Sequence, residues 1–135
     1  ELHDHHFDGK DLQFKEKLNK TYELISTHEE KLATRLLDYL NSVSEIKIIG
    51  HTSPAAEKRV PTISFVHQNF RSNEIVEAVD PHHIGIRFGD FYAKKLIQDL
   101  QLEDNNGVVR VSLVHYNTLE EVDKLIEVFK TIFKS

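Results

Sequence analysis

Apolar residues in the first part of the chain recur at intervals of three and four, the period of an amphipathic helix. The pattern extends over about residues 9–41 and comprises Phe14, Leu18, Tyr22, Ile25, Leu32, Leu36 and Leu40. Thr27 followed by Glu30 also matches a capping box, so we expect a kink at residues 26–30. The sequence therefore predicts one long N-terminal helix.

Short apolar runs separated by turn residues predict four strands and three further helices. Strands are expected at 46–50, 60–66, 84–89 and from 108 onward, and helices at 73–79, 91–100 and 119–133. Pro61 places the second run at the start of a strand or on a sheet edge, because proline cannot donate to a ladder. Ser72 and Asp90 are the expected N-caps of the two middle helices. This order predicts an α/β sandwich with one small sheet of about four strands.

The last predicted helix has the clearest local signals. Thr118 and Glu121 form a capping box at its start. One apolar stripe follows at helical spacing, and we expect it to be buried on the sheet: Val122, Leu125, Ile126, Phe129, Ile132 and Phe133.

Composition narrows the classes of protein. The 135 residues suffice for one domain with a core, and the net charge of −5 argues against a nucleic-acid or anionic-membrane surface. No apolar run approaches a membrane span, and the absence of cysteine excludes a disulfide framework, so we expect a cytoplasmic protein. The sequence does not begin with methionine, which favours a piece of a longer protein.

Histidines gather at three places. The first combines types that bind metals: His3, Asp4, His5, His6 and Asp8. Ligand geometry at a chain terminus is unconstrained, so we expect a solvated segment there, with a zinc-binding protein as the alternative. We expect His82 and His83 at the surface. We expect His115 to pack beside the strand that begins at residue 108, with a position near a ligand as the alternative.

Two arginines interrupt otherwise apolar strands. Arg110 lies between Val109 and Val111, and Arg87 lies between two apolar neighbours as well. Burial of an unpaired guanidinium is very costly, and its planar fork suits a carboxylate or a phosphate. Each arginine alone could lie on the exposed side of a strand. Two of them on one small sheet favour a shared anion site.

Three segments resemble the small domain of class-V aminotransferases and cysteine desulfurases. Residues 108–123 resemble the last strand and helix of that domain, 59–65 its second strand, and 85–93 a strand-turn-helix beside the active site. The resemblance covers about residues 21–135. It implies that residues 1–20 are an N-terminal segment with the start of a linking helix, and that 21–135 form the small domain.

Members of this family are homodimeric fold-type-I enzymes that use pyridoxal phosphate (PLP). A large domain ahead of the small one supplies the Schiff-base lysine, usually after a histidine, and no His-Lys dipeptide occurs here. The resemblance therefore implies a C-terminal domain fragment that is inactive and binds no PLP alone, whose partner is the missing PLP-binding domain. It also implies that Arg110 holds the carboxylate of an amino-acid substrate and that Arg87 is a second active-site cation.

One position departs from the desulfurase pattern. Tyr92 stands where those enzymes carry the cysteine that accepts sulfur as a persulfide. A phenol cannot form a persulfide, which needs a thiolate, so a usual sulfur-transferring desulfurase is not expected. The alternative to an enzyme domain is a freestanding α/β module that binds a small anion through the same arginines.

Overall fold

A single antiparallel sheet organises the chain. The computed structural model describes residues 2–7 and 12–134. Its strands are β1 (Ile46–Ile49), β2 (Thr62–His67), β3 (Arg87–Gly89) and β4 (Val108–Ser112), in the spatial order β1-β2-β4-β3. Its helices are α1 (Leu2–His6), α2 (Phe14–Ser42), α3 (Ser72–Val79), α4 (Lys94–Asp99) and α5 (Leu119–Phe133), with a 3-10 turn η1 (Asp80–His82). The predicted α/β architecture with about four strands and a long N-terminal helix is confirmed.

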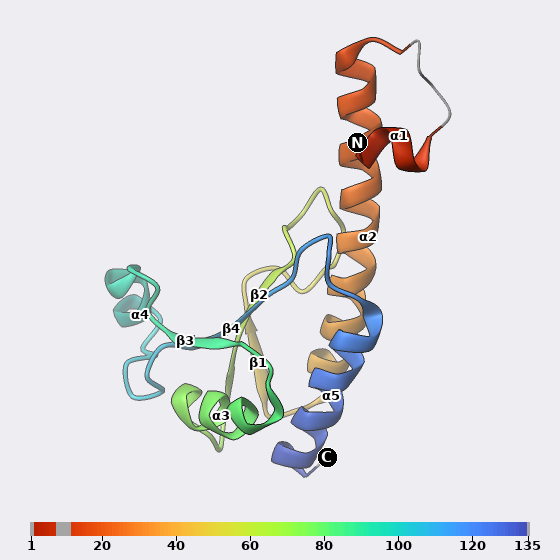
Figure 1. The fold of residues 1–135 in the computed structure, drawn as a ribbon. Helices are drawn as coiled ribbons and strands as arrows, with labels where there is room; N and C mark the ends of the chain where they lie inside the picture. The colour runs from red at the N-terminus through yellow and green to blue at the C-terminus, as the bar shows by residue number, and fades with distance from the viewer. Residues whose placement is uncertain (1, 8–11, 135) are drawn as a thin grey trace.

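The two faces of the sheet differ because side chains alternate along each strand. The first face, which includes Ile63 and Phe65 of β2, forms the main core with α2, α3 and α5. Figure 1 shows α5 beside the lower half of α2, on the same side of the sheet. The second face carries the alternate residues of β2 and β4, and Ile97 of α4 covers its Val66–Val108 end. Arg110 lies on this second face and is only half-buried.

Helix α2 is continuous, so the predicted kink at residues 26–30 is wrong. Unbroken backbone hydrogen bonding there outweighs the local capping pattern of Thr27 and Glu30. Leu32 and Leu36 in the second half are fully buried, whereas Phe14 and Tyr22 in the first half are 80% and 62% exposed. Figure 1 shows this first half extending beyond the sheet. The predicted packing across the sheet therefore holds for the second half alone, and predicted helix residues 9–11 lie outside the described residues.

The starts of the middle elements also differ from prediction. Arg71 is the N-cap of α3, and Ser72 is a buried first residue whose Oγ donates a hydrogen bond to the carbonyl of Gly107 at 3.1 Å. Helix α4 begins at Lys94 rather than at residue 91, and strand β3 occupies only the end of the predicted run 84–89. Asp90 caps a turn instead of a helix, because the two residues after it have left-handed backbone.

The predicted cap and apolar stripe of α5 are confirmed. The Glu121 backbone N–H donates to Thr118 Oγ1 at 3.2 Å, and the Thr118 N–H donates to Glu121 Oε2 at 3.0 Å. The hydrogen bond from the Asn117 side chain, and after it the one from the Thr118 N–H, hold the pKa of Glu121 below its usual value. Phe129 is fully buried and packs edge-on against Phe65 at 5.7 Å between ring centroids.

Candidate functional site

Arg110 and Arg87 occupy facing positions on β4 and β3. The antiparallel register pairs Arg87 with Arg110, and it pairs Arg110 with Ser64 on the other side. Directly opposite residues share a face, with Cβ atoms roughly 4.5–5.5 Å apart. The two arginines that the sequence singled out are thus brought together on the second face of the sheet.

Neither arginine is neutralised by an acidic side chain within the described residues. Two carboxylates in the segment that follows β3 have other partners: Asp90 Oδ1 accepts from the Tyr92 N–H at 3.0 Å, and Asp99 pairs with Lys95 within α4. Like charges directly opposite each other destabilise a sheet. The positive charge of the two arginines is therefore not balanced by an ion pair within the described residues.

The Arg110 side chain is less buried than its apolar strand suggested. Arg110 is half-buried and Arg87 is exposed, so solvent reaches this part of the face. Among the described residues, the only buried side-chain nitrogen or oxygen without a partner is Nε2 of His3. The nitrogens of Arg110 are therefore not buried, and its N–H groups are open to solvent.

An aromatic ring lies against the guanidinium of Arg110. The Arg110 Cζ atom is 3.8 Å from the centroid of the Phe91 ring, a close cation–π contact. Phe91 follows β3 in a turn where both it and Tyr92 have positive φ values, 50° and 65°. Left-handed backbone costs an L-residue about 1–2 kcal/mol, and such strain is concentrated at functional sites.

Sequence reasoning missed Phe91 because residues 91–100 were assigned to a helix. A possible signal was the position of an aromatic residue just after Gly89-Asp90, a typical turn pair, and close to an arginine strand. Tyr92 has a fully exposed side chain on this same turn.

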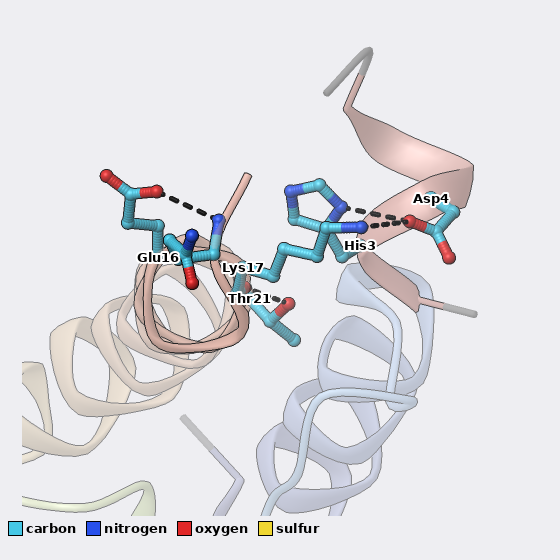
Figure 2. Close-up of polar contacts among 6 residues, drawn as sticks. His3, Asp4, Glu16, Lys17 and Thr21 are labelled. Carbon is cyan, nitrogen blue, oxygen red and sulfur yellow. Dashed lines mark hydrogen bonds and ion pairs between the residues drawn. The ribbon is translucent and has the colours of Figure 1, made fainter. Parts of the chain in front are cut away.

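Residues 2–6 of the N-terminal histidine cluster form helix α1. Asp4, His5 and His6 are exposed, as predicted, but His3 is buried, so the predicted solvated segment is wrong for His3. His3 is buried against α2, and its Nδ1 is 3.2 Å from Asp4 Oδ1, which also lies 3.8 Å from Lys17 Nζ (Figure 2). The hydrogen bond from His3 is the largest cause that lowers the pKa of Asp4. Across residues 2–7 and 12–134 no three potential ligands gather into a metal site, and Asp8 lies outside the described residues.

The remaining histidines that the sequence singled out lie on the surface. His82 and His83 are exposed, as predicted. His115 was expected to pack beside a strand, but it is exposed, with its ring 5.5 Å from that of Tyr116. Strand β4 ends at Ser112, so His115 belongs to the loop before α5 and has no sheet to pack against.

The sheet order and the helices packed against the sheet define an α/β domain of the kind found in fold-type-I PLP enzymes. Residues 12–125 match the family described as aminotransferase class-V. The chain belongs to this family.

Two curated relatives give the degree of similarity. The aminotransferase-like protein FGM3 of Gibberella zeae is 47% identical over 114 residues, which are 84% of this chain and 28% of the relative. A probable cysteine desulfurase of Staphylococcus aureus is 28% identical over 109 residues, 81% of this chain and 25% of the relative. The chain thus spans about a quarter of the length of the relatives that it matches.

Solved structures agree with this assignment. An apo cysteine desulfurase from Thermococcus onnurineus NA1 has a TM-score of 0.76 at 26% identity, over 89% of this chain and 28% of that one. The fold also matches the Escherichia coli GDP-4-keto-6-deoxy-D-mannose-3-dehydratase, solved with bound hydrated PLP, with a TM-score of 0.61 at 18% identity, over 84% and 33% of the two chains. Within the described residues, no helix combines the length and the apolarity needed to cross a bilayer.

Proposed function

We propose that this chain supplies the substrate-carboxylate site of a larger, homodimeric PLP-dependent enzyme of the class-V type, which acts on an amino acid in the cytoplasm. In this proposal Arg110 holds the carboxylate and Arg87 is a second cation beside it. The observation that carries the proposal is the facing pair of arginines, which no acid in the described residues neutralises. A guanidinium with accessible N–H groups can hold a carboxylate through two parallel hydrogen bonds.

The residues on the second face fit substrate recognition better than attachment of PLP. When bound, PLP would supply an electron sink for bond cleavage at the substrate Cα. Its attachment needs a lysine, and the strands offer one lysine on this face, Lys47, exposed on the edge strand β1. Strand β2 lies between Lys47 and Arg110. We therefore propose that the PLP-binding residues belong to a separate domain.

The class of reaction is narrowed by Tyr92. A persulfide forms on a cysteine thiolate, and the chain contains no cysteine. The 28% identity to a probable cysteine desulfurase thus supports a related framework without supporting sulfur transfer through this turn. We propose a transferase or lyase that does not route sulfur through position 92.

The test is substitution of Arg110 in an enzyme that contains this domain together with a PLP-binding domain. Hydrogen bonds to charged groups contribute roughly 1.5–3 kcal/mol each, and about 1.4 kcal/mol corresponds to a factor of ten. Arg110→Ala should therefore lower kcat/KM by roughly a hundredfold or more. Arg110→Lys should recover only part of this loss, because an ammonium keeps the charge without the planar fork.

Lys47→Ala is the matched control, since it removes a cation from the same face at a distance from the arginine pair. It should leave kcat/KM within about twofold of the wild-type value, as expected for a surface change away from the site. The absorbance of the bound cofactor should persist in all three variants. An Arg110→Ala enzyme with wild-type kcat/KM would remove this arginine from the substrate site.

A further inference from the structure

The turn between β3 and α4 places an aromatic ring where it can fix the direction of Arg110. A free arginine side chain has many rotamers, and ordering it upon ligand binding lowers the affinity. In this structure the Arg110 Cζ atom contacts the Phe91 ring, 3.8 Å from its centroid. The Phe91 ring also joins the small apolar cluster formed with Ile97 and Val108. The Phe91 ring therefore packs against this apolar cluster while it contacts the guanidinium of Arg110.

The backbone of the turn explains how Phe91 reaches this position. Phe91 and Tyr92 both have left-handed φ values, so the chain reverses directly after β3 instead of continuing into a helix. Asp90 stabilises the reversal twice: its carboxylate accepts from the Tyr92 N–H at 3.0 Å, and its carbonyl accepts from the Ala93 N–H at 2.8 Å. The hydrogen bonds of Asp90 thus stabilise an unfavourable backbone conformation at Phe91 and Tyr92. This conformation places the Phe91 ring on the guanidinium of Arg110.

We infer that Phe91 is a positioning residue that pre-orders Arg110 for a carboxylate, an inference that rests on the carboxylate role proposed above. A ring on the face of a guanidinium leaves its N–H edges available, and those edges are what a carboxylate binds. The contact also stabilises the positive charge of Arg110 next to the like charge of Arg87. Phe91 itself contributes no hydrogen bond to the ligand.

The test uses the 135-residue chain labelled with ¹⁵N, with acetate as the probe. In the wild type the Arg110 Nε should give a heteronuclear NOE typical of ordered backbone, and its proton should be shifted upfield by the ring. Phe91→Leu keeps an apolar side chain on the same backbone but removes the ring. It should lower the NOE and weaken acetate binding roughly threefold to tenfold, the cost of ordering one long side chain.

Two variants control for general effects of the substitution. Phe91→Tyr retains the aromatic face and should keep the NOE and the affinity near the wild-type values. Phe88→Leu removes a 42% exposed ring from the opposite face of β3 and should change neither. Thermal unfolding of each variant identifies loss of the fold. If Phe91→Leu does not fold, the wild-type chain still tests the inference, because a heteronuclear NOE of a disordered side chain at Arg110 Nε would contradict positioning by Phe91.

The outcomes separate this inference from the proposed function. If the Phe91→Leu chain keeps both the Arg110 NOE and the wild-type acetate affinity, positioning by Phe91 is wrong. If the wild type shows an ordered Arg110 that only Phe91→Leu loosens, but no site responds to acetate, the positioning stands and the carboxylate role of Arg110 fails.

Discussion

At the scale of single residues, His67 is a buried titratable group whose protonation affects stability. It ends strand β2, and its ring stacks on Phe133 at 4.6 Å and contacts Phe70 at 5.0 Å. Its Nδ1 accepts a hydrogen bond from the Asn69 N–H at 3.0 Å, which requires an unprotonated nitrogen. Burial lowers the pKa of His67, and the nearby Glu45 opposes this shift only in part.

This lowered pKa predicts a loss of stability in mild acid. The unfolded histidine titrates near its ordinary pKa of about 6.5, so below that pH the unfolded chain binds a proton that the folded chain resists. The free energy of unfolding should thus be highest above pH 6.5 and decrease as the pH falls towards the folded-state pKa. Urea unfolding at pH 7.5, 6.5 and 5.5 measures this slope. His67→Phe keeps the ring stacking and should reduce the slope, and an unchanged slope would contradict the assignment.

At the scale of elements, the start of α5 is fixed by reciprocal bonds between Thr118 and Glu121. Removing an N-cap hydroxyl costs about 1 kcal/mol, within a range of roughly 0.5–2. Thr118→Ala should lower the free energy of unfolding by that amount, as measured by urea denaturation. Thr118→Ser keeps the hydroxyl and is the matched control. Equal stability of the alanine and serine variants would show that the cap contributes nothing.

The elements also show what the sequence could predict. The existence of four strands, the cap of α5 and its apolar stripe, which includes Val122, followed from apolar periodicity and capping chemistry. These features are confirmed, although β3 is shorter than predicted. The turn at residues 89–93 was not predictable in the same way, because Phe91 and Tyr92 are not residue types that favour positive φ. Nearby tertiary contacts, such as the Phe91 ring with Arg110, accompany that conformation.

The sequence predicted the two arginines of the candidate site but not their positions relative to each other. The alternation of apolar residues located Arg87 and Arg110 on strands, but the sheet order that makes β3 and β4 neighbours comes from pairing over long sequence separation. The register then places the two arginines opposite each other. Local patterns do not specify such pairing, so the contact between the Phe91 ring and Arg110 was not predicted either.

At the scale of the whole molecule, some apolar side chains are buried in the core and others are exposed along one helix. The second half of α2 and one face of the sheet form the core, whereas Phe14 and Tyr22 on the first half of α2 are exposed. Exposed apolar residues at helical spacing favour contact with another protein surface. Together with the quarter-length match to family members, this supports the proposal that a PLP-binding domain acts with this one.

If the PLP-binding residues lie in a separate domain, as proposed, the 135-residue chain alone should not bind PLP covalently at one defined lysine. Lysine reacts with the cofactor efficiently when burial or a neighbouring cation lowers its pKa. The lysine on the second face, Lys47, is exposed on an edge strand and points away from the core cluster that contains Ile48. Incubation with PLP, borohydride reduction and peptide mapping should give substoichiometric label spread over several lysines, and Lys47→Ala should not change its total. Stoichiometric label at a single lysine would show that this domain carries its own cofactor site, and the proposed separation of cofactor and carboxylate binding would then be wrong.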